Sequence, residues 1–465
     1  MRVSTDWLQL AGLAACAILA ATPVCAETFT LNEALATAYE TNPTLDAQRA
    51  DLRATDEGVA QANANWRPSI NLQGTYGIEQ QKFAASQGPF GPQPPRTLNS
   101  QPLTGQLSIT QPIFRGGQTW AEVGRAKALV GVGRAQLFLT EENVLLDAAT
   151  AYMDVVRDTQ SVLLREQNLA ALEQQLRDTQ TEASVGEQTK TDVAQAQARL
   201  SVARSDLATA RAQLGISRSR FEQVIGRQSE TLERLPGLPN LPPSLDAALQ
   251  IAEVRNPNMI GARDNEKAAQ YQVDEAEGAL MPQASVQAFY EYGRNSINLG
   301  LQQGQTERLG AVIGQVTVPI YQGGGDEATV RRAKELHSEA MVQIAQADRQ
   351  VRDSVRAAWE SFVAAKASIA SNQQAVNANR QAYEGVKEQW KLGDRTTLDV
   401  LNAEQELISS QLALVNSQHD MVVAAFQLLS ATGQLTARDL ALRVNYYDPL
   451  EHYNNDAGAW FGFGN

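Results

Sequence analysis

The spacing of apolar residues along this chain alternates between two periods, and each change of period predicts a new element. Three short stretches alternate apolar and polar residues with the period of a β-strand: 69–76, 104–110 and 285–288. A fourth stretch, 309–320, carries apolar residues on both faces. We therefore predict four strands, which suit either a half-buried soluble hairpin or a barrel between lipid and a wet lumen.

Helical periods occupy most of the remaining chain. Residues 117–185 contain no proline and are rich in Ala, Leu, Gln, Glu and Arg, which predicts one helix of about 100 Å. The helices near 31–66 and 190–225 are each about half as long, so that placed end to end they would match the long one. The second of these carries a heptad seam of alternating small and large residues: Val193, Ala196, Leu200, Ala203, Leu207, Ala210 and Leu214. The seam predicts close helix packing, which a simple antiparallel coiled coil also satisfies.

The chain consists of two copies of one unit. Leu31-Asn32-Glu33-Ala34-Leu35 with Asn42-Pro43 recurs 214 residues later as Leu245-Asp246-Ala247-Ala248-Leu249 with Asn256-Pro257. Downstream, Gly117 and Gly186 recur as Gly324 and Gly393, an offset of 207 residues. The seven-residue difference falls between the two strands of each copy, where residues 86–95 of the first copy predict an exposed, irregular tip.

This duplication divides the chain into four parts. We predict a signal peptide (1–26), a first repeat (27–240), a second repeat (241–436) and a C-terminal tail (437–465). Each repeat is expected to contain a helix, a β-hairpin (69–115; 283–322), a long helix (117–185; 324–392) and a return helix (187–226; 394–433). The tail suits either a wrap around the middle of the molecule or an anchor at a surface.

The first residues predict export. An apolar stretch over residues 8–26 follows Arg2 and ends in Val24-Cys25-Ala26, which is typical of a secretory signal cleaved after Ala26. Both cysteines, Cys16 and Cys25, fall inside it, so the predicted mature chain can form no disulfide. Lipidation at Cys16 is the alternative, although an apolar run follows that cysteine rather than a polar tether.

Charge and hydropathy narrow the choice of partners. The net charge of −13 argues against nucleic acid, and the mean hydropathy of −0.32 does not describe a helical membrane bundle. No later run approaches the roughly 18 apolar residues of a membrane helix, so insertion into a membrane would have to use the strands. Four strands have open edges, which lipid does not tolerate, so a barrel would require several copies of the chain.

Three features together resemble the TolC family of outer-membrane efflux proteins. They are the duplicated Leu-x-x-Ala-Leu openings with Asn-Pro, the strand pairs, and a Val/Leu-Gly-x-x-x-x-x-Asp-Val turn after each long helix. The resemblance implies a mixed α and β fold: a homotrimer in which four strands per protomer close one transmembrane β-barrel, and the helices form a coiled-coil periplasmic tunnel. It also implies an exit duct in the outer membrane, for a tripartite efflux pump or type I protein secretion.

The same resemblance implies protein partners and no cofactor. A periplasmic adaptor protein and an inner-membrane transporter are expected to deliver the substrate, and the transporter supplies the energy. The outer membrane lipid surrounds the barrel. The identity of the substrate, and whether the pump is driven by protons or ATP, stay open. A structural coiled-coil protein of the periplasm or cell surface is the rival interpretation.

The turn motif also singles out candidate gate residues. By their position in it, five residues resemble the gate groups of the family: Asp192, Trp390, Arg395, Asp399 and Asn402. Arg395 and Trp390 are expected to bond across to Asp192 on the other hairpin as a latch, although a solvated ion pair there would contribute under about 1 kcal/mol. Asp399 would form a ring of three carboxylates that favours cations. Asn402 stands where a second acid is frequent, which puts the strength of cation selection in doubt.

Six further residues at the turns are expected to contact the adaptor or the pump: Val185, Gly186, Thr191, Leu392, Gly393 and Leu398. An enzyme is the class with least support. The three histidines, His337, His419 and His452, are scattered, and no Ser/His/Asp set or metal-ligand spacing emerges. Acidic residues beside arginines on the helices predict solvated faces. We therefore assign no catalytic and no metal-binding residue from sequence.

Overall fold

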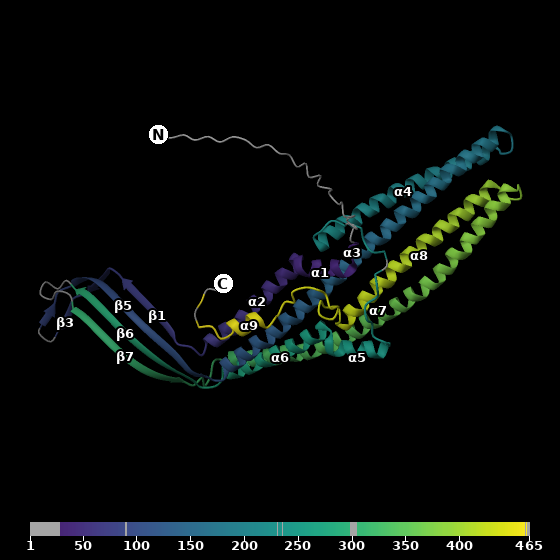
Figure 1. The fold of residues 1–465 in the computed structure, drawn as a ribbon. Helices are drawn as coiled ribbons and strands as arrows, with labels where there is room; N and C mark the ends of the chain where they lie inside the picture. The colour runs from purple at the N-terminus through teal and green to yellow at the C-terminus, as the bar shows by residue number, and fades with distance from the viewer. Residues whose placement is uncertain are drawn as a thin grey trace, which may run out of the picture.

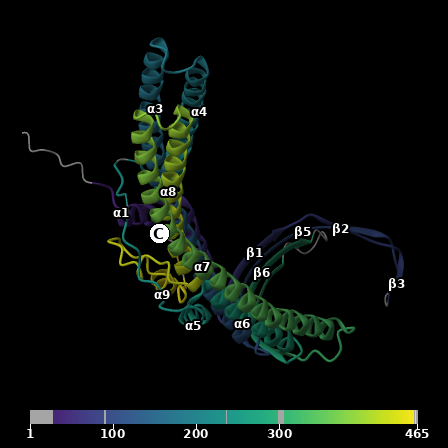
Figure 2. The ribbon, with the colours of Figure 1, turned by 90° about the vertical axis from the view of Figure 1, so that its right-hand side faces the viewer.

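The computed structural model describes residues 28–88, 91–229, 231–234, 236–297, 305–460 and 462. The predicted signal peptide and the Cys16 alternative lie outside these residues. Figures 1 and 2 show an elongated molecule, with a curved sheet projecting from one end and two long helical hairpins forming the other. In chain order the elements are α1 (Leu31–Thr41), α2 (Pro43–Ala64), β1 (Ser69–Tyr76), β2 (Glu79–Phe83), β3 (Ser86–Gly88), β4 (Gly91–Gln93), β5 (Arg96–Arg115), α3 (Gln118–Ser184), α4 (Lys190–Ile225), α5 (Leu245–Arg255), α6 (Pro257–Gly278), β6 (Gln283–Ile297), β7 (Gln305–Thr317), α7 (Gly325–Lys391), α8 (Thr397–Thr432) and α9 (Glu451–Asp456).

The sheet joins the two repeats through their strands. Its antiparallel order is β1-β5-β6-β7, and β2 continues beside β5. The pairing of β5 with β6 connects the first repeat to the second, with Leu107 opposite Tyr290. Residues 86–95 were expected to be irregular, but β3 and β4 pair there as a small hairpin, in which Gly91 supplies a backbone φ of 110°. Neither face of the curved sheet is covered by a helix in either view (Figures 1 and 2).

The opening helix of each repeat is broken, where the sequence predicted one continuous helix near 31–66. Asn42 is extended, with φ −74° and ψ 119°, because Pro43 lacks an N–H and disfavours a helical residue before it. The Asn42 side-chain oxygen caps α2 by accepting from the Thr44 N–H at 2.9 Å. Its amide donates to the Val224 carbonyl at 3.0 Å, so the Asn-Pro motif also fastens α2 to the end of α4.

Each long helix packs against three shorter helices of its own repeat. Helix α3 contacts α1 and α2 towards the sheet and α4 towards the far end, and α7 contacts α5, α6 and α8 in the same way (Figure 1). The seam predicted on the first return helix is confirmed, because its members from Ala196 to Leu214 are buried and Val193 is half-buried. None of the helices in the described part of the chain is long and apolar enough to cross a membrane.

Helix α8 has a second buried face that its heptad seam does not predict. The seam of the first return helix recurs on α8 at Val400, Ala403, Leu407, Ser410, Leu414, Ser417 and Met421. Val400 and Ser417 of the seam are buried, and the other seam members are half-buried. Leu401, next to the seam, is also buried and packs against Leu172 and Leu200 of the first hairpin. The two hairpins therefore pack against each other, in addition to the packing of the two helices within each hairpin.

The main hydrophobic core lies in the middle of the molecule, where α1, α3, α4 and α8 meet. Tyr152 and Phe221 are fully buried there, and the Tyr152 hydroxyl donates to the Phe29 carbonyl at 2.7 Å. Ala437 and Leu442 of the tail join this core. The tail therefore packs against the middle of the molecule first, and α9 then lies along α2 (Figure 1).

Glu141 and Glu142, which are adjacent in α3, are buried, against the expectation of solvated acidic faces. Glu141 accepts a hydrogen bond from the Ala437 N–H at 2.7 Å. Glu142 is 2% exposed, and burial raises its pKa to about 9, with the neighbouring Glu141 carboxyl adding to the effect. The expectation failed at Glu141 because the tail contacts it through the Ala437 N–H.

Candidate functional site

Each long helix ends at a glycine that reverses the chain. Gly186 has φ 87°; its N–H donates to the Ala183 carbonyl at 3.3 Å, and the Glu187 N–H donates to the Glu182 carbonyl at 3.0 Å. These are the paired bonds of a Schellman motif, and they recur at Gly393, whose φ is 84°. A side chain added at either glycine would meet no neighbouring atom, so glycine is not required here for lack of space. It is required because the backbone has a positive φ, which costs other residues about 1 kcal/mol or more.

The two predicted gate aspartates start the return helices. Thr189 caps α4, and the Asp192 carboxylate accepts from the Thr189 N–H at 3.0 Å while the Asp192 N–H donates to the Thr189 hydroxyl at 3.2 Å. The same capping box, with the same two distances, joins Thr396 to Asp399 at the start of α8. The turn motif therefore has a local structural role in both repeats.

Both carboxylates are held in their charged form. Hydrogen bonds from the Thr189 hydroxyl and N–H lower the pKa of Asp192. The Thr396 N–H and hydroxyl lower the pKa of Asp399, with a smaller contribution from the charge of Arg395. Each hairpin tip consequently presents a fixed negative charge one helical turn from its reversal.

The remaining gate candidates lie on or beside the second tip. Trp390 is half-buried in the last turn of α7, and Arg395 is exposed in the turn, where its Nε–H donates to the Gln389 side chain at 3.1 Å. Among the described residues of this single protomer, neither Trp390 nor Arg395 has a hydrogen bond or ion pair with Asp192. The latch across hairpins stays a prediction.

Apolar side chains project at both tips. Val185 is 69% exposed, and Leu392, its equivalent in the second repeat, is 78% exposed. Thr191 and its equivalent Leu398 are exposed in the first turn of the return helices. The six predicted contact residues, which include Gly186 and Gly393, thus lie together at the two tips (Figure 1).

Two hydrogen bonds join the hairpins near their tips. The Arg199 guanidinium of α4 donates to the Asn402 side-chain oxygen of α8 at 3.0 Å. The Thr397 hydroxyl, in a residue only 1% exposed, donates to the Gln188 side chain at 3.4 Å. Sequence reasoning missed both, because the partners lie about 200 positions apart and are not equivalent in the repeat. Asn402 thus has a partner of its own in place of a second acid.

The comparisons with known proteins follow this duplicated architecture. Two parts of the chain, residues 34–227 and 248–434, match the model of the outer membrane efflux protein family. The chain belongs to this family. The two matches correspond to the two repeats, and together they cover most of the described residues.

Relatives of this efflux protein share nearly its whole length. The outer membrane efflux protein BepC of Brucella suis is 37% identical over 433 residues, which cover 93% of this chain and 91% of BepC. The outer membrane protein TolC of Escherichia coli is 25% identical over 411 residues, covering 86% of this chain and 81% of TolC. The resemblance to the TolC family is therefore confirmed.

A solved structure agrees on the fold. The crystal structure of the outer membrane protein VceC of Vibrio cholerae superimposes with a TM-score of 0.72 at 21% identity, covering 87% of this chain and 96% of VceC. The mixed α and β fold with two internal repeats is confirmed. The chain is an outer-membrane exit duct whose helical part extends into the periplasm, and the rival interpretation of a structural coiled-coil protein is set aside.

Proposed function

We propose that three copies of this chain close one barrel and form the exit duct of a tripartite efflux pump. The observation that carries the proposal is the register of the sheet. Ile70, Ile109, Ala288 and Val312 lie directly opposite one another across all four long strands, so apolar side chains form a continuous row on one face. On the other face, Gln73, Gln106 and Glu291 are opposite one another.

The exposed apolar face and the edge strands support closure with other copies. Leu72, Val312 and Val316 are 81%, 74% and 70% exposed, and no described part of the protomer covers them. In the order β1-β5-β6-β7, the strands β1 and β7 each have one unpaired edge, which lipid does not tolerate. Pairing β7 of one copy with β1 of the next satisfies those edges, and three copies give a twelve-stranded barrel.

The hairpin tips are the proposed docking and gating region. Val185 and Leu392 offer apolar contacts to a periplasmic adaptor or an inner-membrane transporter. Asp192, Trp390 and Arg395 are the proposed latch, and Asp399 the proposed cation-selective ring. We assign this duct no catalytic activity and no cofactor.

Substitutions at the hairpin tips test whether efflux depends on the docking of the tips to an adaptor or a transporter. Val185→Asp combined with Leu392→Asp places charge on the two exposed tips, and we expect it to abolish efflux while leaving the complex assembled in the outer membrane. The matched control is Val202→Asp, at an exposed position of α4 away from the tip. The measurement is the accumulation of a fluorescent efflux substrate in a strain lacking the chromosomal copy.

The outcome of that experiment distinguishes a duct for efflux from a duct for type I protein secretion. Restored dye export by the unsubstituted chain and by the control, but not by the double variant, supports the proposal. If deletion of the gene leaves dye accumulation unchanged and instead stops export of a protein, the duct serves type I secretion, and the efflux assignment is wrong.

A further inference from the structure

The C-terminal segment is fastened along α2 by contacts at its far end. The Asn63 side-chain amide donates to the Ala457 carbonyl at 3.0 Å. The Arg67 guanidinium donates to the Gly458 carbonyl at 3.2 Å and lies 4.6 Å from the centre of the Trp460 ring. These contacts place α9 on the face of α2 that carries two adjacent acids, Asp56 and Glu57.

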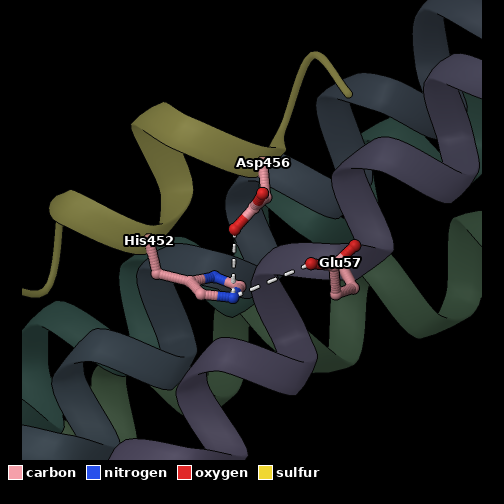
Figure 3. A group of neighbouring side chains, drawn as sticks. All are labelled: Glu57, His452 and Asp456. Carbon is pink, nitrogen blue, oxygen red and sulfur yellow. Dashed lines mark ion pairs between the residues drawn. The ribbon is translucent and has the colours of Figure 1, made fainter. Parts of the chain in front are cut away.

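His452 lies at the centre of this contact. Its Nε2 is 3.3 Å from Oδ2 of Asp456, one turn further along α9, and 3.8 Å from Oε1 of Glu57 on α2 (Figure 3). One ligand atom from each of the three residues lies within 4.8 Å of the others. Sequence reasoning found no such spacing, because Glu57 is almost 400 positions away and only the docking of α9 brings it close.

The second ring nitrogen of His452, Nδ1, faces the buried carboxylate of Asp56. Asp56 is 2% exposed, and neither of its carboxylate oxygens has a hydrogen-bond partner among the residues that the structure describes, although Oδ2 lies 3.4 Å from Nδ1 of His452. Histidines that bind metal usually direct their second nitrogen to a carboxylate, which fixes the ring and leaves the other lone pair for the metal. Asp56 stands where that carboxylate is required.

The charges around the imidazole favour a cation. Three carboxylates surround it, and the nearby cation is Arg134 of α3, whose guanidinium is stacked 5.1 Å from the centre of the Tyr453 ring. A divalent ion at Nε2 would offset the remaining negative charge.

We propose that His452, Asp456 and Glu57 bind a divalent transition metal and that Asp56 orients the imidazole. The bound ion would then cross-link α9 to α2. One imidazole and two carboxylates suit zinc, which commonly takes three protein ligands and a water. Ligands about 2.0–2.1 Å from a tetrahedral ion lie about 3.3–3.4 Å apart, which is close to the separation of His452 from Asp456. Glu57 is exposed and needs only a small side-chain movement to complete the set.

Zinc titration of the full-length, detergent-solubilised protein, purified without a polyhistidine tag, tests this site. After chelation of resident metal, we expect isothermal titration calorimetry to show one zinc ion per chain. His452→Gln abolishes binding, and Asp456→Asn weakens it. Asp56→Asn, whose side chain is not a ligand, weakens binding about 10- to 100-fold because the ring loses its orienting partner.

The matched control is His337→Gln, which removes a histidine paired with a single carboxylate, that of Glu266 at 2.7 Å. It keeps full zinc binding. Circular dichroism and particle mass verify that each variant is folded, and cobalt substitution reports tetrahedral coordination by its visible absorption. Absence of zinc binding by the unsubstituted protein overturns the proposal, as does equal binding by His452→Gln. Neither result depends on efflux, so the site and the proposed function can fail separately.

Discussion

Arg199 of α4 donates a hydrogen bond to Asn402 of α8 over 3.0 Å, and this contact joins the two helical hairpins close to their tips. Its position suggests that the relative placement of the hairpins is set within each protomer as well as between protomers. A charged donor to a neutral acceptor contributes about 1 kcal/mol, and less where solvent reaches it.

Removing this contact is expected to loosen the periplasmic mouth. Arg199→Ala frees α4 from α8, so we expect a higher single-channel conductance in planar bilayers. Arg177→Ala is the matched control, because in the described part of the chain the Arg177 guanidinium donates to Gln174 of its own helix and to no residue of another helix. Equal conductance for Arg199→Ala and the unsubstituted duct would show that the contact does not restrain the mouth.

The proposed latch predicts a larger opening. Arg395→Ala is expected to raise single-channel conductance, since it removes the charge that would hold Asp192. Asp192→Ala should do the same, but it also removes a helix cap. Thr189→Ala separates the two effects: it costs about 1 kcal/mol of cap stability but leaves the carboxylate in place. Unchanged conductance in both Arg395→Ala and Asp192→Ala would contradict the assignment of these residues to a latch.

Charge removal at Asp399 tests the acid ring. Asp399→Asn keeps an oxygen that can accept from Thr396 but removes one negative charge per protomer. Block by a multivalent cation such as hexaamminecobalt should therefore weaken, with the half-blocking concentration rising at least several-fold. Asp394→Asn, in the exposed turn itself, is the control. Undiminished block in Asp399→Asn would count against a ring at this position.

The buried acid Glu142 predicts that stability falls with rising pH. Its pKa is about 9 in the folded protein against an ordinary value of 4.5, so the folded state holds the proton more tightly. The associated stability is fully present below about pH 4.5 and is lost as the pH rises towards 9. At pH 7 the loss is on the order of 3 kcal/mol, by the linkage of about 1.4 kcal/mol per pH unit.

Glu142→Gln removes that dependence. The variant should melt at a higher temperature than the unsubstituted protein at pH 8, with the difference shrinking at pH 5. Glu166→Gln, an exposed acid of the same helix, should leave the pH profile unchanged. A parallel pH profile for Glu142→Gln and the unsubstituted chain would mean that Glu142 is not the titrating group.

Much of the architecture could be predicted because it depends on local and repeated signals. The seam from Ala196 to Leu214, the reversals at Gly186 and Gly393, and the strands in pairs all follow from periods or backbone requirements that one stretch of sequence contains. The break at Asn42 was present in the sequence as Asn-Pro, and its meaning as a cap became clear only from the Thr44 and Val224 bonds.

Contacts between the repeats and with the tail could not be predicted in this way. Arg199 and Asn402 meet because α4 and α8 lie side by side, and no period relates the two positions. Glu141 contacts a tail that begins almost 300 positions later, and Glu57 contacts His452 because the same tail docks on α2. Such pairings leave no trace in a single sequence.

The mass of the complex extracted from outer membranes tests the central claim most directly. Native mass spectrometry of the detergent-solubilised protein should give three chains per particle. Pairing of β7 with β1 of a neighbouring copy satisfies the open edges of the sheet, and the resemblance to the TolC family implies that the number of copies is three. A single chain, recovered without detergent from the periplasmic fraction, would contradict the account.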